Sequence, residues 1–464
     1  MIYINVQRID SMKIKKMRMT IDFYKYLFFL NYGQGIKLII NVAIFAISFI
    51  SFLYNNLFSV VRDGSGSWLF IILMIYSIFN ISWSLYEKYE EISDFKGKNK
   101  DIIMKSKSIL VKDDKAVQLN DIHAESRGNI QFENLKLNGP RDEQQEPVIY
   151  SEDINHYIWD NDFTIERDLI KERKIKKFIK KNREIITPFF QYKYYDSKKN
   201  NQLFFNESKL SMSSEINPKN KHVLFNKSNY YHSYLTNEIS TSTLQRVEDA
   251  TIIYDASNFY PCEHKKLDKE NDITYLQPMD KCEMSNHIGI STLAVTKDNY
   301  LVIRKQGINT QQNINKYVPT GSGSADWSDI QNYSLHDTLK FAMDRELWEE
   351  NGGKCLKIPM NKFGDTKVLG YFRWLRRGGK PEFVGITKLH VSLSQLTPDN
   401  SEFINTTNKA DRDTFYLDGI DDVPKVIQEI QKKDNLSIPL QMCLIFLLDY
   451  YEERREDLEG MLGL

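Results

Sequence analysis

Two long uncharged runs near the amino terminus dominate the hydrophobic pattern of the chain. The first covers residues 38–61 and the second 64–86, with only Arg62 and Asp63 between them. Each run is long enough to cross about 30 Å of hydrocarbon as a helix. The first run begins too late and is too long for a cleaved signal peptide. The pattern therefore predicts a two-helix transmembrane hairpin over residues 36–88.

Positive charge flanks this hairpin on both sides. The flanking cations are Arg8, Lys13, Lys15, Lys16, Arg18, Lys25 and Lys37 before it, and Lys88, Lys96, Lys98 and Lys100 after it. Cytoplasmic flanks of membrane helices are enriched in Lys and Arg. We therefore expect both flanks, and both termini, on the cytoplasmic side, with residues 1–35 forming a basic arm and the loop at Arg62 outside.

Each predicted membrane helix carries one polar stripe. The stripes consist of Asn41, Ser48, Ser51 and Asn55 in the first helix, and of Ser77, Asn80 and Ser84 in the second. Small and amide side chains in membrane helices usually hold neighbouring helices together. The alternative is that several hairpins assemble with these stripes inward and admit water and ions. Two helices alone offer no broken-helix site of the kind that transporters use.

A polar middle region, residues 89–240, follows the hairpin. Residues 112–147 contain Gly128, Gly139 and Pro140 and predict a linker with at most one hairpin. Apolar pairs over 165–185 predict a strongly basic helix, whose cations either face solvent or contact lipid headgroups or an anionic ligand. Residues 221–237 have the pattern of a strand that enters a short helix.

The last part of the chain, residues 241–464, alternates strand and helix patterns. The predicted strands cover residues 287–295, 298–305, 367–375 and 382–391, and the last two form a hairpin around 376–379. A helix over 438–457 begins after Ser437, with Pro439 in its first turn. Strands on both sides of one acidic helix fit a mixed sheet packed between helices.

That acidic helix is predicted over residues 334–352. Ser334 is a good N-cap, Asp337 stands where a capping-box acid belongs, and Gly352 with Gly353 supplies the stop. At about 100° per residue, one apolar stripe faces the core. This stripe consists of Leu339, Met343 and Leu347.

The same helix gathers three glutamates, Glu346, Glu349 and Glu350, on one flank. Arg345 lies four residues before Glu349 and can orient its carboxylate. Clustered carboxylates repel one another unless a hard cation such as Mg²⁺ or Mn²⁺ neutralises them. The alternative is a solvated acidic surface without a ligand. The pattern makes the three glutamates candidate metal ligands.

Composition and cysteine usage narrow the remaining chemistry. The formal net charge is zero, so any basic site must be local, and binding to a nucleic-acid duplex is not expected. The four cysteines have no regular spacing, which fits a reducing compartment better than a disulfide framework. A Zn²⁺ site from Cys262, His264, Cys282 and His287 remains an alternative, although their spacing matches no standard finger.

The run from Arg345 to Gly353 resembles the second half of the Nudix box of hydrolases that act on nucleoside-diphosphate-linked substrates. The resemblance implies a C-terminal Nudix-like α/β/α sandwich with a mixed sheet. It also implies that Glu346, Glu349 and Glu350, oriented by Arg345, bind Mg²⁺ or Mn²⁺ and act in catalysis. The first half of the box differs, because Asp337 replaces the expected glutamate and Gln331 the expected glycine.

A glycine-bearing loop at 319–327 precedes the acidic helix and is a candidate ligand site. Backbone N–H groups at Gly321 and Gly323 could converge on a phosphate, and Trp327 could stack on a base. These features are equally consistent with a simple turn and a core tryptophan. Four arginines could add bonds to phosphate oxygens, namely Arg304, Arg373, Arg376 and Arg377.

The hairpin, the middle region and the Nudix-like domain together resemble the two-transmembrane Nudix effectors of bacterial CBASS antiphage systems. This resemblance implies an inner-membrane protein that recognises a cyclic oligonucleotide, forms homo-oligomers on activation and disrupts the lipid bilayer, which causes abortive infection. A ligand that favours the assembled state would drive this change without catalysis. The alternative is a metal-dependent Nudix hydrolase acting on a nucleotide diphosphate-linked substrate at the membrane.

Overall fold

The computed structural model consists of two compact units. It describes residues 2–30, 32–57, 65–107, 109–112, 115–126, 130–138, 145–204, 206–266, 272–307, 315–353, 355–397 and 413–464. Unit 1 comprises Met1–Met104, Lys180–Asp196 and Leu244–Tyr254. Unit 2 comprises Lys105–Ile179, Ser197–Thr243 and Asp255–Leu464.

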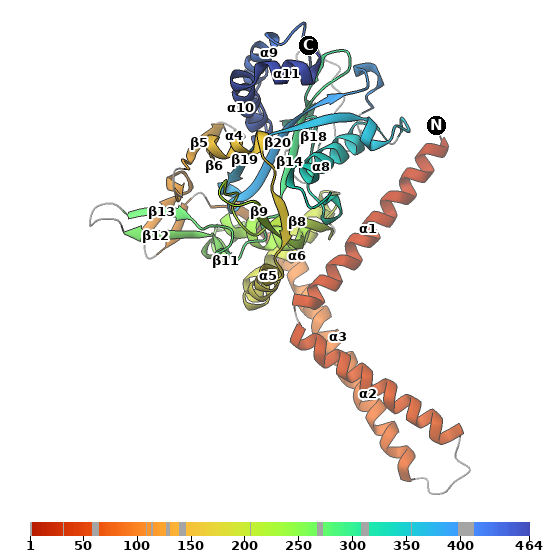
Figure 1. Cartoon of the computed structure of the whole chain (residues 1–464). Helices are drawn as coiled ribbons and strands as arrows, with labels where there is room; N and C mark the ends of the chain where they lie inside the picture. The colour runs from red at the N-terminus through yellow and green to blue at the C-terminus, as the bar shows by residue number, and fades with distance from the viewer. Residues whose placement is uncertain are drawn as a thin grey trace. The chain divides into compact units, whose positions relative to one another are not determined.

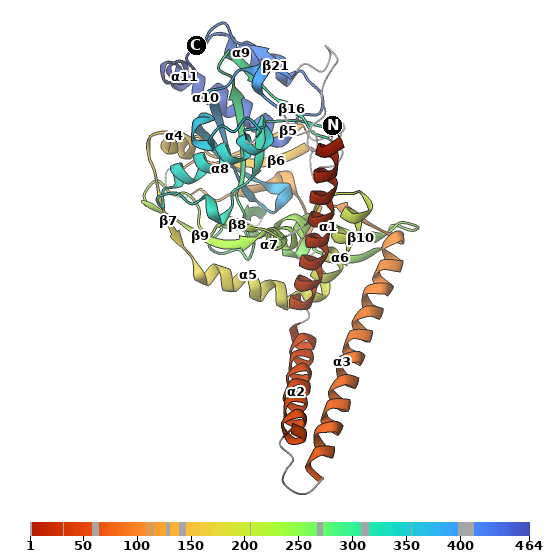
Figure 2. The ribbon, with the colours of Figure 1, turned by 90° about the vertical axis from the view of Figure 1, so that its right-hand side faces the viewer.

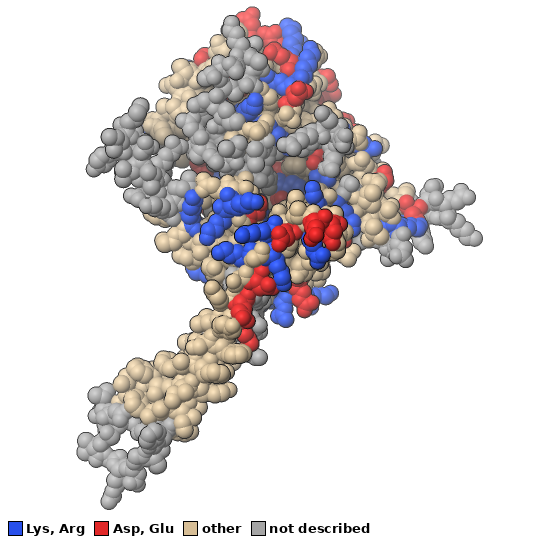
Figure 3. Space-filling view, turned by 180° about the vertical axis from the view of Figure 1, so that it is seen from behind, with Lys and Arg blue, Asp and Glu red and all other residues tan. Residues whose placement is uncertain are grey.

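Unit 1 is built from long helices. Its amino-terminal part forms α1 (Ile2–Leu30), α2 (Tyr32–Leu57) and α3 (Ser65–Lys98), and α2 packs along α3 (Figures 1 and 2). Figure 3 shows that the described surface of these two helices carries no charged side chains over most of its length. The turn predicted at Arg62 and Asp63 lies outside the described residues.

One stretch of the described chain is long and apolar enough to cross a membrane. It covers Leu69–Glu87 of α3, 19 residues with a mean hydropathy of 1.8, and is 6% buried. The apolar stretch described in α2, Ile39–Tyr54, is shorter. The two predicted helices are therefore present and paired, while their crossing of a bilayer remains a prediction.

The polar stripes of α2 and α3 include residues that the two helices bury. Ser48 in α2 is 3% exposed and Ser77 in α3 is fully buried. The Nδ2 of Asn80 donates to Tyr76 O of its own helix at 2.9 Å. This arrangement agrees with the interpretation that small polar side chains let the helices pack closely.

Aromatic side chains hold α1 against α6 (Arg183–Lys199) within unit 1. The ring of Phe23 stacks on Tyr194 with centroids 3.8 Å apart, and Phe190 lies on the same cluster. The Tyr194 hydroxyl donates to Thr20 Oγ1 at 3.2 Å. A small sheet of β1 (Ile102–Ser106), β10 (Ser242–Arg246) and β11 (Ile252–Asp255) accompanies these helices.

Unit 2 is organised around an eight-stranded mixed sheet with the order β21-β15-β14-β20-β19-β6-β5, in which β18 also pairs with β14. Its strands are β5 (Glu133–Asn138), β6 (Gln145–Tyr150), β14 (Gly289–Val295), β15 (Tyr300–Val302), β18 (Gly321–Ser324), β19 (Gly364–Trp374), β20 (Lys380–Leu389) and β21 (Thr414–Tyr416). Strand β20 pairs antiparallel with β19 and parallel with β14. The β19–β20 hairpin confirms the sequence prediction.

Helices cover both faces of this sheet (Figure 1). A methyl group at Gly385 would lie 2.8 Å from Met343 Sδ of α8 (Leu335–Glu350), and one at Gly370 would lie 2.3 Å from the Phe446 ring of α10 (Ile438–Glu453). Gly370 pairs with Val384, the neighbour of Gly385, and neighbouring strand residues point to opposite faces. Helix α8 and helix α10 therefore lie on opposite faces, and α4 (Glu152–Asp160) also contacts β19.

Smaller elements complete unit 2. The strands are β2 (Ile109–Lys112), β3 (Lys115–Gln118), β4 (Ile122–Ala124), β7 (Thr164–Arg167), β8 (Ser208–Met212), β9 (His222–Asn229), β12 (Cys262–Lys266), β13 (Asp272–Leu276), β16 (Arg304–Lys305) and β17 (Tyr317–Val318). The helices are α5 (Leu169–Lys181), α7 (Tyr230–Ser233), α9 (Asp422–Gln431) and α11 (Arg455–Leu462). Strand β8 lies beside the main sheet, because Leu210 N donates to Ala325 O and Ile288 N to Leu210 O.

The middle region is more ordered than the sequence predicts. Residues 112–147, expected as a linker, contribute β3, β4 and β5 and the start of β6, while Gly128, Gly139 and Pro140 lie outside the described residues. The boundary expected at residue 240 differs from the structure, because β5 and β6 extend the sheet formed by later strands. The strand and short helix expected at 221–237 are present as β9 and α7.

The predicted basic helix is also partly different. Residues 164–167 form β7, and the rest form α5 followed by α6. Lys171 on α5 is 1% exposed, and its Nζ donates to the carbonyl oxygens of Met279 and Cys282. At least this cation therefore anchors the helix inside unit 2 rather than facing solvent.

Candidate functional site

Helix α8 carries the candidate site and follows its sequence signals closely. The Ser334 hydroxyl accepts a bond from Asp337 N at 3.0 Å, which caps the helix. Gly352 has a φ of +84°, a left-handed conformation that suits a glycine after the last turn. The predicted apolar stripe of Leu339, Met343 and Leu347 is buried, which fixes the flank on which the glutamates lie.

Arg345 is the centre of an ionic network. Its Nε and Nη2 each lie 2.9 Å from one oxygen of Asp329, a carboxylate only 1% exposed. Its Nη1 lies 2.9 Å from Glu346 Oε1 and 3.4 Å from Glu349 Oε2. Burial alone would lower the pKa of Arg345, but the bond to Asp329 and the charge of Glu346 raise it overall. Arg345 therefore contacts Glu349, the carboxylate that it is predicted to orient, and it also binds Asp329, a partner that the prediction did not include.

Glu346 lies against the backbone of β18. A methyl group at Gly323 would lie 2.3 Å from the Glu346 carboxyl carbon, so only glycine leaves room for this carboxylate. Burial raises the pKa of Glu346 to about 7, against the opposing charges of Arg345 and Lys209. At neutral pH the Glu346 carboxyl group is therefore present in both its protonated and its anionic form.

The other two glutamates have separate surroundings. Glu350 is 6% exposed, and its Oε2 accepts a bond from Ser322 N at 3.1 Å. The Glu349 side chain is 51% exposed and contacts Arg345. Among the described residues, no three His, Cys, Asp or Glu side chains are grouped so that they could hold one metal ion. The guanidinium of Arg345 bridges Glu346 and Glu349, so in this arrangement the three carboxylates do not fit a shared Mg²⁺ or Mn²⁺.

Lys209, on β8, brings the middle region to this site. Its Nζ lies 2.6 Å from Asp326 Oδ1 and 3.6 Å from Glu207 Oε2, and its side chain is only 9% exposed. The same charge lowers the pKa of Glu346 and of His287. The site therefore contains a buried cation contributed by a strand more than 100 residues before α8.

A second buried ionic group lies close enough to interact with Lys209. Lys380 pairs with Glu382, and Arg377 pairs with Glu238 and, at 3.5 Å, with Glu382. Burial, together with the charges of Arg377 and Lys209, lowers the pKa of Lys380 to about 8 against the opposing effect of Glu382. Arg377 lies in the turn between β19 and β20, and Lys380 and Glu382 lie at the start of β20. Glu238 lies shortly before β10.

Two buried polar atoms of this group have no hydrogen-bond partner among the described residues: His287 Nδ1 and Arg377 Nε. Burial, with the charges of Lys380 and Lys209, lowers the pKa of His287 well below its usual value, so its ring is neutral. Buried polar atoms are nearly always bonded to protein or water. The interior beside Lys209 therefore has capacity for further polar contacts.

The predicted phosphate loop is a strand. Gly321 and Gly323 belong to β18, which pairs with β14, and a methyl group at Gly321 would lie 2.9 Å from the Leu347 Cα. Both glycines thus allow close packing of β18 on α8. Trp327 is partly buried against the core, with the guanidinium of Arg167 5.1 Å from its ring centroid.

The predicted arginines are dispersed. Arg304 is 6% exposed and its Nε and Nη2 donate to Asn351 Oδ1, at 3.2 and 2.9 Å, so it braces the end of α8. Arg376 donates to Ser106 Oγ and Gln145 O. Arg377 belongs to the ionic group near Lys209, whereas Arg373 pairs with Glu215 beside a separate cavity.

The zinc alternative has no support in the described residues. Cys262 and Cys282 are buried free thiols, and His264 Nδ1 lies 2.9 Å from Thr274 Oγ1. All four residues are described, and they belong to no group of three His, Cys, Asp or Glu side chains that could hold a metal ion. The cysteines therefore act here as small core residues.

Sequence reasoning missed Asp329, Lys209, His287, Lys380 and Glu382 as one assembly. Asp326 and Asp329 form a capping box, and their spacing of three residues is a signal that the sequence offers. The other four residues lie on β8, just before β14 and at the start of β20, and they share no spacing rule. Only the pairing of β8 with the main sheet brings them together.

A mixed sheet between helices, with a capped helix bearing Arg345 and three glutamates on one face, is the arrangement that the Nudix resemblance predicts. No protein-family model and no curated protein matches the chain. Among solved structures, the chain is similar to DR0079 from Deinococcus radiodurans, with 11% identity, a TM-score of 0.23 and coverage of 34% of this chain and 80% of that chain.

It is also similar to the MutT protein from Methanosarcina mazei Go1, with 14% identity, a TM-score of 0.24 and coverage of 36% of this chain and 94% of that chain. At these TM-scores neither similarity adds to the argument. The Nudix-like description therefore rests on α8 and on the sheet that it covers.

Proposed function

We propose that this protein is a membrane-anchored receptor and effector of the cyclic-oligonucleotide class. Its Nudix-like unit binds a phosphate-bearing nucleotide, and its hairpins then assemble and disrupt the inner membrane. The observation that carries the proposal is the position of Arg345. The glutamates that a hydrolase would use are bridged by this guanidinium, and the cations Lys209, Lys380 and Arg377 lie nearby.

The unbonded atoms beside Lys209 support ligand binding at this place. Phosphate oxygens accept charge-assisted bonds from Lys and Arg, and such bonds are stronger than those between neutral groups. Arg377 Nε is a donor that such a ligand would satisfy. Because Lys209 and Arg377 each already pair with a carboxylate, ligand binding would exchange partners, which is a route to a change of conformation.

The membrane part of the proposal rests on α3. The Leu69–Glu87 stretch is 6% buried and exposes large apolar side chains such as Phe79 and Trp83. A bilayer would remove this surface from water. If ligand binds the assembled state more tightly than the separate chains, the population shifts toward assembly by the difference in affinity.

Leakage from lipid vesicles tests the proposal. The full chain is reconstituted into liposomes that contain a self-quenched dye, cyclic di- and trinucleotides are added, and cleavage of the nucleotide is followed by chromatography. We expect one class of cyclic nucleotide to cause leakage without turnover. Leakage should persist in the double variant Glu349→Gln, Glu350→Gln and decrease in Asn80→Leu, which inserts normally. Loss of leakage in the double variant with retained ligand binding would contradict a purely receptor role.

A second function is favoured by one specific observation: the three box glutamates share one flank of α8 next to Arg345. The protein would then be a hydrolase of nucleotide diphosphate-linked substrates, which requires that Arg345 release Glu346 and Glu349. In that case chelation of divalent cations and the Glu349→Gln, Glu350→Gln double variant should each abolish turnover. Turnover that survives both changes would exclude this function.

A further inference from the structure

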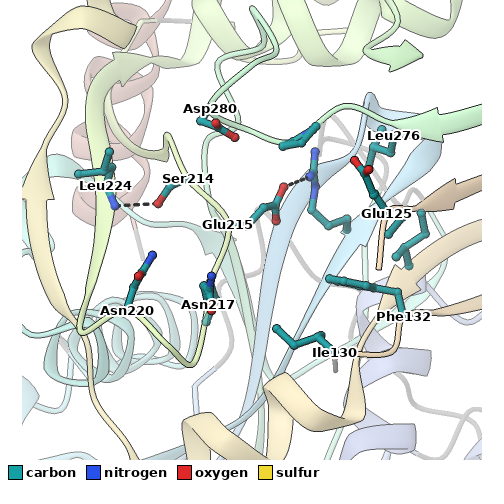
Figure 4. Close-up of a pocket in the computed structure, with 15 residues that line it drawn as sticks. Glu125, Ile130, Phe132, Ser214, Glu215, Asn217, Asn220, Leu224, Leu276 and Asp280 are labelled. Atoms are coloured by element: carbon teal, nitrogen blue, oxygen red, sulfur yellow. Dashed lines mark hydrogen bonds and ion pairs between the residues drawn. The ribbon is translucent and has the colours of Figure 1, made fainter. Parts of the chain in front are cut away.

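A cavity of about 250 Å³ lies in unit 2 apart from the glutamates of α8. Its described lining comes from the end of β4 and the residues after it, the β8–β9 connection, residues 276–280 and Arg373, and includes no residue of α8. Figure 4 shows Glu215, Asp280, Asn217 and Phe132 around the same space. Drug-sized ligands occupy pockets of about 300–1,000 Å³, so this cavity suits a smaller group.

The walls combine apolar surface with hydrogen-bond acceptors. Phe132, Ile130 and Leu276 supply apolar surface on one side of the space in Figure 4. Asp280 has no ion pair or hydrogen bond among the described residues, whereas Glu125 pairs with Lys265. The cavity therefore presents a flat aromatic group and at least one unpaired carboxylate, which accepts bonds from N–H groups.

Arg373 adds a donor to these acceptors. Its side chain is 6% exposed, its Nε donates to Gly379 O and its Nη1 pairs with Glu215. Glu215 also accepts bonds from Met279 N at 3.1 Å and from the Tyr371 hydroxyl at 3.3 Å, so it is held in place. Nη2 is the nitrogen of this guanidinium without a partner among the described residues. A buried donor of this kind points to an acceptor atom on a ligand.

We propose that this cavity binds a nucleobase whose edge presents a carbonyl oxygen beside N–H groups, as the edge of guanine does. The carbonyl oxygen accepts from Arg373 Nη2, the N–H groups donate to Asp280, and Phe132 packs on the ring. Enzymes that extract a base from a helix read it with the same combination of edge hydrogen bonds and stacking. The site adds base recognition to the nucleotide receptor proposed above and can fail separately from it.

The test uses guanosine, which has no phosphate and therefore does not report on the cations near Lys209. Binding of guanosine, adenosine and cytidine to the full chain in detergent is measured by titration calorimetry. Arg373 is too deeply bonded for a clean substitution, so the variant is Asp280→Asn, with Glu456→Gln on the exposed surface of α11 as the matched control. Thermal unfolding of each variant verifies that the fold is retained.

We expect guanosine to bind at least about tenfold more tightly than adenosine and cytidine. Because hydrogen bonds to a charged acceptor are stronger than those to a neutral amide oxygen, Asp280→Asn should weaken guanosine binding about tenfold or more, while Glu456→Gln leaves it unchanged. Equal affinity for adenosine, unchanged affinity in Asp280→Asn, or no binding of any nucleoside would each overturn the assignment. None of these results would alter the expected response of the vesicles to a cyclic nucleotide.

Discussion

Replacing Arg345 by methionine should destabilise unit 2 strongly. The substitution keeps an unbranched apolar side chain but removes both 2.9 Å bonds to Asp329 and the bridge between Glu346 and Glu349. Asp329 is 1% exposed and would remain as a buried carboxylate, although Asp326 N still donates to it. Breaking a buried ion pair by removal of one partner costs about 3–5 kcal/mol.

Two features of the structure support the upper part of this range. The bonds to Asp329 are bidentate, and each charge-assisted bond contributes about 1.5–3 kcal/mol. The burial of Asp329 prevents water from replacing the lost donor. Adding Asp329→Asn to Arg345→Met removes the buried charge that Arg345 had neutralised. The double variant should therefore recover part of the lost free energy of unfolding and reveal a coupling energy between the two residues.

Urea unfolding of the full chain in detergent, followed by tryptophan fluorescence, measures this effect. The matched control is Arg455→Met, which breaks the pair between Arg455 and Asp421 on the exposed surface and should change stability little. If Arg345→Met shifts the unfolding midpoint no more than the control, the Arg345 network does not stabilise unit 2. If the double variant is no better than the single one, the buried charge of Asp329 is not the cause.

Three further substitutions test separate parts of the fold. Burial lowers the pKa of His232 from 6.5 to about 3, so between these pH values only the unfolded chain binds a proton at this residue. The free energy of unfolding should therefore fall below pH 6.5, by roughly 2 kcal/mol at pH 5. His232→Gln should remove this pH-dependent loss when unfolding is measured at pH 5 and 7.5. Gly370→Ala places a methyl group against Phe446 and should cost about 1–3 kcal/mol in urea unfolding, whereas Gly460→Ala, with open space around it, should not destabilise. Ser77→Leu should separate α2 from α3 and so lower the yield of disulfide cross-links between engineered cysteine pairs on the two helices. A yield equal to that of Ser77→Ala would show that the helices do not pack at Ser77.

Features that depend on neighbours in sequence could be predicted. The cap at Ser334, the buried stripe through Met343, the end of α8 at Gly352 and the β19–β20 hairpin each follow from the order of a few adjacent residues. The long helices α2 and α3 also follow from local composition. In these cases the physical cause and the sequence signal occupy the same stretch of chain.

Features that depend on distant residues could not be predicted. The sequence makes Gly321 and Gly323 candidates for phosphate binding, whereas the structure places them in a close-packed strand. The sequence does not separate these cases, because a glycine pair before a helix is typical of both a loop and a close-packed strand. The contact of Glu346 with Gly323 decides between these, and it exists only after β18 pairs with β14. Lys209 reaches α8 through the pairing of β8, a register that no spacing in the sequence encodes.

The eight-stranded sheet of unit 2 combines strands from the C-terminal part of the chain with β5 and β6, which lie much earlier in the sequence. Because β6 pairs with β19, a fragment beginning at residue 241 would leave the β19 edge without its partner and expose a row of unpaired backbone N–H and C=O groups. Such an edge attracts other chains, so the fragment should precipitate where the longer chain does not. During synthesis on the ribosome, the early strands must likewise wait for the later half before either can be buried.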